Sequence, residues 1–198
     1  MRYNKTIRIL HLMLMLGVLA QLCSELLMQV PKPGESIDQM AGFFFSIHQL
    51  IGFVVLIIAI TYLMVIMEHS KHKNRLFPWL DATLRAELIR EIQRDIPGWF
   101  RGVLPSPDQA HLLAGTVHGL GLILATGLGL SGSVIYLGIN SDGSMPPPIH
   151  TIKELHEILG TLMWIFMAGH LVMALLHQVK GHQVLQKIFT ADGRNRGS

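Results

Sequence analysis

The sequence has little charge and almost no cysteine. Only 15% of its 198 residues are charged, against roughly 25% in soluble domains. Half of the residues are apolar, and the mean hydropathy is +0.42. This composition excludes an ordinary soluble domain and directs attention to membrane spans. The single cysteine, Cys23, excludes an internal disulfide and the C-x-x-C-H motif of covalently attached haem.

Four apolar runs are long enough to cross a bilayer core of about 30 Å at about 1.5 Å per residue. They cover approximately residues 7–30, 43–67, 112–139 and 155–179. The first run is too long for a signal peptide and no A-x-A-like cleavage site follows it, so we expect it to remain as a span. The sequence predicts an all-α fold, a four-helix transmembrane bundle in a single membrane domain of residues 1–198.

The basic residues indicate the orientation of the bundle. Fourteen of the 16 Lys and Arg residues lie at the N-terminus, in the second loop (68–111) or in the C-terminal tail. The two outer loops contain only Lys32 and Lys153. By the positive-inside rule, both termini are predicted to be cytoplasmic. The net charge of +3 therefore reflects topology, and we expect no nucleic-acid partner.

The two longer loops differ in character. In the second loop an apolar residue recurs every four positions, which predicts an amphipathic helix on the cytoplasmic surface. These residues are Leu80, Leu84, Leu88, Ile92 and Ile96. Such a helix either covers the membrane interface or docks a partner. The third loop ends in Pro146, Pro147 and Pro148 and is predicted to be an irregular connection.

Histidines occur in all four predicted spans. They are His11 in the first, His48 in the second, His118 in the third, and His156, His170 and His177 in the fourth. Polar residues at membrane depth are costly and usually functional. One histidine is readily explained by an interhelical hydrogen bond, but six distributed in this way are harder to explain without a ligand.

The spacing of these histidines predicts two sites at different depths. His156 and His170 are 14 residues apart, which places them within roughly 40° of the same helix face and about 21 Å apart along the axis. His48 lies at about the depth of His156. His11, near the cytoplasmic side, can meet the inner half of the fourth span. The result is two bis-histidine sites stacked across the membrane.

Paired imidazoles favour haem iron, which accepts axial ligands from opposite sides. A zinc or copper site would need three or four close ligands. The third span is rich in glycine, which either leaves room for a porphyrin or allows close helix packing. Those glycines are Gly115, Gly119, Gly121, Gly127, Gly129 and Gly132. The sequence therefore predicts two non-covalent haem b groups.

The inner ligand on the fourth span is open to one alternative. His177 follows His170 by seven residues on the same face, and its depth matches His11 at least as well. With His177 as ligand the two irons would lie about 31 Å apart along the axis, against about 21 Å with His170. Because electron tunnelling slows steeply with distance, His170 is favoured.

Several motifs in all four spans resemble the bacterial cytochrome b561 family. This family includes the membrane cytochrome b subunits of nickel–iron hydrogenases and formate dehydrogenases. The motifs are Arg8-Ile-Leu-His11, Ile47-His48, Leu155-His156-Glu157, Gly169-His170, Ala174-Leu-Leu-His177, and the third-span run from His118 to Gly129-Leu-Ser-Gly132. The second loop is longer than in compact members, and His177-Gln178 stands where a double histidine is often found.

The resemblance implies which histidines bind which haem. It pairs His11 with His170 at a cytoplasmic-side haem, and His48 with His156 at a periplasmic-side haem. It also implies a quinone near the cytoplasmic-side haem, with His118 and His177 as candidate neighbours; either histidine could equally contact a haem ligand or a haem propionate. The implied location is the bacterial cytoplasmic membrane, with membrane lipid and a periplasmic redox protein or iron–sulfur subunit as partners.

These observations predict a dihaem membrane cytochrome that transfers electrons between a periplasmic-side partner and the quinone pool. We expect a membrane subunit of a respiratory complex, an electron-transfer component without catalytic side chains of its own. A stand-alone quinone-linked cytochrome b561-type oxidoreductase is the first alternative. A metal or proton transporter that uses intramembrane histidines is a second, from a different class.

Overall fold

The computed structural model describes residues 5–99, 112–140 and 142–179, and all regular structure in these residues is helical. Within this part of the chain, four helices are long and apolar enough to cross a membrane. They are α1 (Lys5–Glu25), α2 (Gln39–Glu68), α5 (Leu112–Gly138) and α6 (Pro147–Val179). Between α2 and α5 lie α3 (Ser70–Leu76), the 3-10 turn η1 (Pro78–Leu80) and α4 (Ala82–Trp99).

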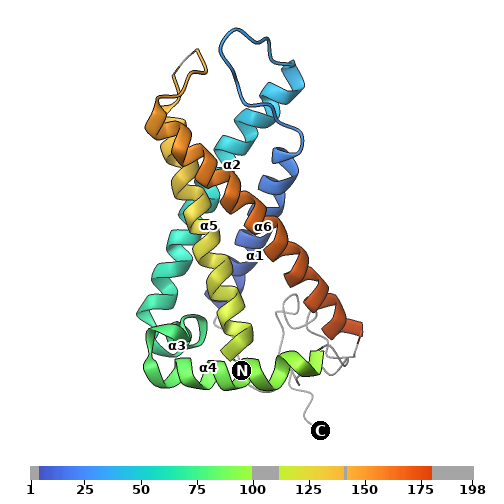
Figure 1. Cartoon of the computed structure of the whole chain (residues 1–198), viewed down its shortest axis with the longest axis vertical. Helices are drawn as coiled ribbons and strands as arrows, with labels where there is room; N and C mark the ends of the chain where they lie inside the picture. The colour runs from blue at the N-terminus through green and yellow to red at the C-terminus, as the bar shows by residue number, and fades with distance from the viewer. Residues whose placement is uncertain (1–4, 100–111, 141, 180–198) are drawn as a thin grey trace.

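The four long helices alternate in direction (Figure 1). The connections 26–38 and 139–146 lie together at one end of the bundle, which we call the loop end. Helices α3 and α4 lie at the opposite end, beside the start of α1 and the end of α6, and α4 runs across that end. We call this the α4 end. The alternation matches the predicted four-helix transmembrane bundle.

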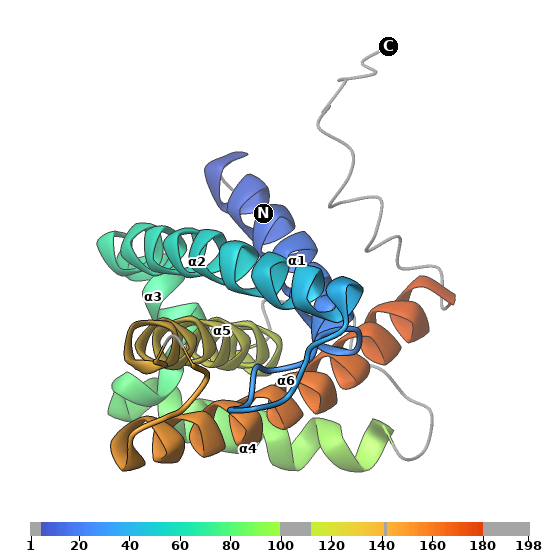
Figure 2. The same ribbon diagram turned by 90° about the horizontal axis from the view of Figure 1, so that it is seen from above.

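The long helices pack in the order α1–α2–α5–α6, and α1 and α6 have few backbone contacts with each other. The core joins Leu14 and Val18 of α1 to Ile58 and Tyr62 of α2. Helix α6 crosses the bundle obliquely, and its later part diverges from α5 (Figures 1 and 2). Side chains nevertheless join α1 to α6, since Trp164 Nε1 donates a hydrogen bond to Glu25 Oε2 at 3.0 Å.

Large apolar side chains cover much of the outside of the long helices. On α6, Leu162, Ile165 and Leu171 are all exposed. Exposure of this kind is costly in water, but it is what a lipid solvent requires once the helix satisfies its own backbone hydrogen bonds. The apolar exterior therefore agrees with membrane insertion.

Two predicted span boundaries were wrong. Helix α1 ends at Glu25, five residues early, where the backbone N–H groups of Leu27 and Met28 both bond to Ser24 O. Helix α6 begins at Pro147, within the segment predicted to be irregular. Proline is well suited to a first helical turn because its missing N–H would have no partner there.

The predicted helix of the second loop is present as α4. The Asp81 carboxylate accepts hydrogen bonds from Thr83 N at 2.8 Å and Leu84 N at 3.2 Å, which caps the helix start. Hydrogen bonds, the first from the Thr83 side chain, hold the pKa of Asp81 below its ordinary value. Leu80, however, belongs to η1 and is 64% exposed. The apolar face is therefore shorter than predicted, with Leu88 as its buried centre.

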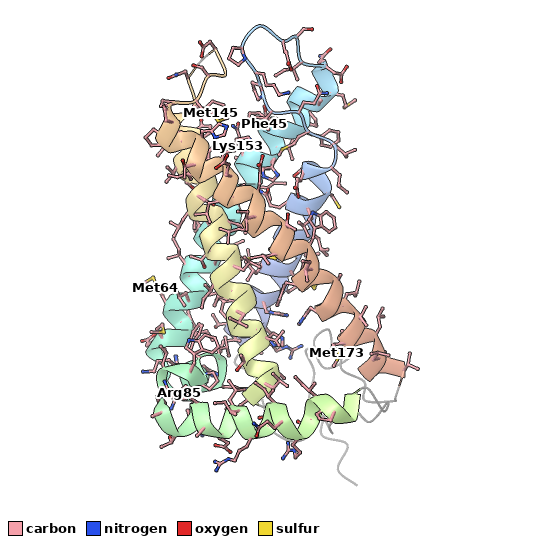
Figure 3. All side chains as sticks on the ribbon, viewed as in Figure 1. Phe45, Met64, Arg85, Met145, Lys153 and Met173 are labelled. Carbon is pink, nitrogen blue, oxygen red and sulfur yellow. The ribbon has the colours of Figure 1, made fainter. Side chains whose placement is uncertain are left out.

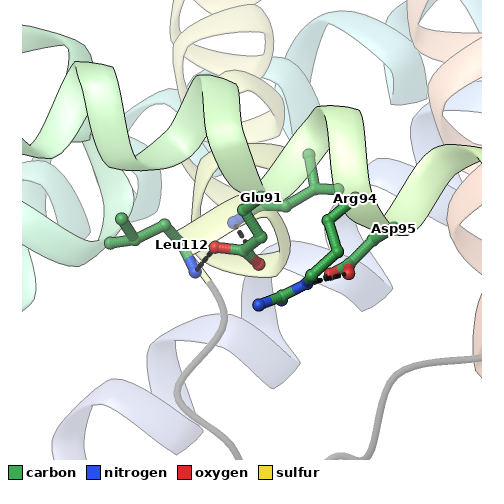
Figure 4. Close-up of polar contacts among 5 residues, drawn as sticks. Glu91, Arg94, Asp95 and Leu112 are labelled. Carbon is green, nitrogen blue, oxygen red and sulfur yellow. Dashed lines mark hydrogen bonds and ion pairs between the residues drawn. The ribbon is translucent and has the colours of Figure 1, made fainter.

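Glu91 ties α4 to the start of α5. Its carboxylate accepts hydrogen bonds from Leu112 N at 2.9 Å and Leu113 N at 3.2 Å (Figure 4). Two backbone N–H groups that an α-helix leaves without partners are thereby satisfied, and the negative charge is favourable at a helix N-terminus. On the same helix, Arg94 pairs with Asp95 at 2.7 Å.

The third-span glycines serve mainly close packing. A Cβ atom at Gly115 or Gly119 would overlap the carbonyl oxygen of Arg75 or Leu76 in α3. A Cβ atom at Gly121 would overlap the Phe166 ring. Of the two explanations left open by the sequence, close helix approach holds at these three positions.

Candidate cofactor sites in the membrane bundle

Two groups of histidines lie at different depths along α6. His48 and His156 form the outer pair, toward the loop end. His11, His118 and His170 form the inner cluster, toward the α4 end. The structure thus brings together both pairs predicted from the sequence and adds His118 to the inner one.

The outer pair joins α2 to α6. The ring centroids of His48 and His156 are 6.5 Å apart and the ring planes are inclined at 80°. Gly132 of α5 lies beside this pair, because a Cβ atom there would stand 3.1 Å from His156 Cε1. A larger residue at position 132 would press on the imidazole.

A buried serine orients His48. Ser24 Oγ lies 3.0 Å from His48 Nδ1 and donates its own hydrogen to Gln21 O at 2.9 Å. A hydroxyl has one hydrogen to donate, and when that hydrogen goes to Gln21 O, the proton of the second contact is on His48 Nδ1. The Nε2 atom of His48 then keeps its lone pair and is available as a ligand.

A second buried serine does the same for His156. Ser131 Oγ lies 2.8 Å from His156 Nδ1 and donates to Gly127 O at 2.8 Å. By the same reasoning, His156 donates from Nδ1 and presents Nε2 as an acceptor. Metal-bound histidines usually have such a partner on the other ring nitrogen, which fixes the tautomer and the ring direction.

The outer pair borders a cavity of about 230 Å³ whose lining is largely apolar. Charged groups lie along it at Glu25, Lys153 and Glu157. Lys153 pairs with Glu157, and Glu25 accepts a hydrogen bond from Trp164 Nε1 at 3.0 Å. Figure 3 shows Lys153 and Met145 near the loop end, where this cavity lies.

The inner cluster joins α1, α5 and α6. One potential ligand atom from each of His11, His118 and His170 lies within 4.8 Å of the others. The ring centroids are 5.4 Å apart for His11 and His118, and 5.0 Å apart for His118 and His170. Phe166 stacks on His170 at 5.5 Å with an interplanar angle of 16°. His118, predicted as a neighbour of the quinone or of the haem and its ligands, therefore lies against both predicted ligands.

The backbone orients His118. Its Nδ1 lies 2.6 Å from Ala114 O, and a carbonyl oxygen can only accept, so Nδ1 carries the proton and Nε2 keeps the lone pair. The side chain of His177 lies outside the described residues, so its predicted roles stay predictions.

Both groups of histidines suit an iron porphyrin. Metal–imidazole bonds are about 2 Å long, so two trans imidazoles have centroids about 6 Å apart. The outer rings, at 6.5 Å, already have this separation. In the inner cluster the ligand atoms of His11 and His170 lie within 4.8 Å of each other, close to the separation of about 4 Å expected for two nitrogens that bind one metal from opposite sides. Neutral nitrogen donors from opposite helices are the ligand set of bis-histidine haem.

A membrane-spanning helical bundle with facing intramembrane imidazoles defines the class of membrane-bound b-type cytochromes. The profile of the family described as prokaryotic cytochrome b561 matches residues 2–191. The chain therefore belongs to the prokaryotic cytochrome b561 family, as its motifs predicted. No curated protein and no solved structure matches the chain.

Membership of this family establishes the general role of the chain. Family members bind haem b and transfer electrons in prokaryotic membranes, and the four candidate spans agree with that location. The predictions of haem, electron transport and a multi-pass membrane protein are confirmed at this level. The number of haems, their ligands, the quinone and the partner belong to the proposal below.

Proposed function

We propose that this cytochrome holds two haem b groups and passes electrons between a periplasmic-side redox partner and the quinone pool. The observation that carries the proposal is the arrangement of His156 and His170 on α6. Each faces histidines from other helices at its own depth, one in the outer pair and one in the inner cluster. Two separate sites on one helix suit a conduit that crosses the membrane.

The proposed ligands are His48 and His156 for the outer haem, and His11 and His170 for the inner haem. Haem supplies the one-electron chemistry when it is bound. The chain supplies neutral Nε2 donors, and Ser24 and Ser131 fix the tautomers of the outer pair. The largely apolar lining of the outer cavity lowers the polarity around those donors, which is one way in which a protein tunes a haem potential.

The proposed quinone site lies beside the inner cluster, on the cytoplasmic side. This placement rests on the basic residues at the α4 end, including Arg85 of α4 (Figure 3), and on the positive-inside rule. His118 and His177 are the proposed neighbours of the quinone, because His118 belongs to the inner cluster and His177 follows His170 by seven residues toward the same end of α6. His118 is half-buried and its Nε2 atom can accept a proton or a hydrogen bond.

We further propose that the chain is a membrane subunit of a respiratory complex. Arg85, Glu87 and Arg90 of α4 are exposed, which suits contact with a polar partner. Affinity purification from membranes solubilised in a mild detergent tests this version. Recovery with an iron–sulfur or multihaem protein supports a subunit, whereas repeated recovery of the chain alone supports a stand-alone oxidoreductase.

A histidine-based metal transporter is the second candidate, and the inner cluster favours it. Three imidazoles with ligand atoms within 4.8 Å are enough protein ligands for zinc. A transporter predicts purified protein without haem absorbance and metal uptake that depends on His118. Haem in the purified protein, with no metal uptake in vesicles, rejects it.

Ligand variants test the two-haem proposal. We expect His48→Ala and His156→Ala each to remove the outer haem, and His11→Ala to remove the inner one. His72→Ala, which changes a histidine of α3 outside the spans, is the control and should keep both. Haem is extracted and counted per chain. Retention of both haems in all three ligand variants would refute the assignment.

A further inference from the structure

The inner cluster contains one histidine more than a bis-histidine haem needs. His11 comes from α1, His118 from α5 and His170 from α6. Among the described residues that line the outer cavity, by contrast, only His48 and His156 are histidines. The extra imidazole therefore distinguishes the inner site from the outer one.

The packing of the helices divides the three histidines into two sides. Helix α5 packs directly on α6, whereas α1 packs on α2 and has few backbone contacts with either. His118 and His170 thus stand side by side on one wall, with ring centroids 5.0 Å apart. The His11 ring, from α1, has its centroid 5.4 Å from that of His118, and its ligand atom lies within 4.8 Å of those of both other histidines. Axial ligands approach a porphyrin from opposite sides, so either histidine of the α5–α6 wall can be the partner of His11.

The orientation of His118 also suits ligation. Its Nδ1–H donates to Ala114 O at 2.6 Å, as the Nδ1–H groups of the outer pair donate to serines. In each case the Nε2 lone pair is the one left for a metal. The centroid separation of His11 and His118, 5.4 Å, is within about 1 Å of the value for trans imidazoles.

We propose that His118 is an alternative axial ligand of the inner haem, able to replace His170 opposite His11. The proposal rests on the proposed dihaem function and deepens it. It gives His118 a role at the iron itself, in addition to any contact with quinone. The inner site should then survive the loss of either His118 or His170, but not the loss of both or of His11.

The test is haem counting in a set of variants of the full chain, purified in detergent. We expect two haems per chain in the wild type, in His170→Ala and in His118→Ala. We expect one in His11→Ala and in the double variant His118→Ala/His170→Ala. The outer haem is the internal control for folding, because it depends on none of these three residues. The double variant Thr126→Ala/His170→Ala controls for a second change on α5, since the Thr126 hydroxyl donates to Leu122 O of its own helix, and should keep both haems.

Electron paramagnetic resonance of the oxidised protein gives a second readout. In His170→Ala, ligation by His118 keeps the inner ferric iron six-coordinate and low-spin. A high-spin signal would mean that the iron has lost its sixth ligand, and it would overturn the proposal.

The outcomes separate the proposal from the function on which it rests. One haem in His170→Ala, with two in the wild type and one in His11→Ala, would overturn the role of His118 and leave the dihaem function intact. Two haems in His118→Ala/His170→Ala would also overturn it. A wild type without two haems would instead refute the dihaem function itself.

Discussion

The hydrogen bond between Ser131 and His156 offers a test of how the chain prepares an axial ligand. Ser131 is 7% exposed, and its hydroxyl lies 2.8 Å from His156 Nδ1. Replacing Ser131 with alanine removes the hydroxyl that accepts the Nδ1–H, and only the weaker backbone contact of the ring with Leu128 remains among the described partners on α5. The volume lost is one oxygen atom, so the packing of α5 on α6 should change little.

The size of the effect follows from similar contacts in metal sites. Loss of a hydrogen-bond partner of a ligating histidine typically weakens metal binding 10–100-fold, which is about 1.4–2.7 kcal/mol. We therefore expect Ser131→Ala to bind the outer haem about 10–100-fold more weakly. The lost bond also makes the imidazole a poorer electron donor, which destabilises ferric more than ferrous haem. For each factor of ten by which the binding of ferric haem is weakened more than that of ferrous haem, the midpoint potential rises by about 59 mV.

The assay is transfer of haem to a haem-free acceptor protein, combined with a potentiometric titration of both haems. Ser133→Ala is the matched control, because Ser133 lies on the same helix and lines the cavity beside the outer pair, but its hydroxyl donates to Gly129 O. An unchanged transfer rate and potential in Ser131→Ala would refute the orienting role of the serine. An equal change in Ser133→Ala would show that the polarity around the outer pair, and not the hydrogen bond to His156, causes the change. That result would also refute the orienting role of Ser131.

Three further predictions concern the fold. Glu91→Ala removes the carboxylate that caps α5, and we expect it to lower the free energy of unfolding by about 1–2 kcal/mol, with a smaller decrease for Glu91→Gln. Equal stability of the wild type and both variants in thermal unfolding would show that the cap contributes nothing. Gly119→Ala forces a Cβ atom onto Leu76 O and should lower the free energy of unfolding by about 1–3 kcal/mol. Gly169→Ala adds a Cβ atom in open space and should not destabilise the protein in this way. Similar unfolding temperatures for the two variants would contradict the close packing of α3 on α5. A reporter that is active only in the cytoplasm should be active after Ser198 and inactive when inserted between Asp142 and Gly143; the reverse result would overturn the proposed orientation.

The spans were predictable because hydrophobic length is a strong signal that does not depend on neighbouring helices. The depth of each histidine follows from its position along the span, so the grouping of His48 with His156 could be anticipated. The start of α6 could not, because a run of prolines marks a loop as often as the first turn of a helix.

The place of His118 was not predictable because a sequence gives depth along a helix but not the direction in which a neighbouring helix faces. The roles of Ser24 and Ser131 were missed for a related reason. Serine and threonine within spans often bond to their own helix, as Thr61 does to Ile57 O at 2.8 Å. Only the packed bundle shows which hydroxyls also reach a histidine.

The most direct test of the account is a spectrum of the purified protein, dithionite-reduced minus oxidised, with the haem extracted and counted per chain. We predict the α-band of b-type haem and two non-covalent haems per chain. A single haem would contradict the two-site arrangement along α6. Protein made with an adequate haem supply that nevertheless contains none would contradict the account as a whole and favour the transporter.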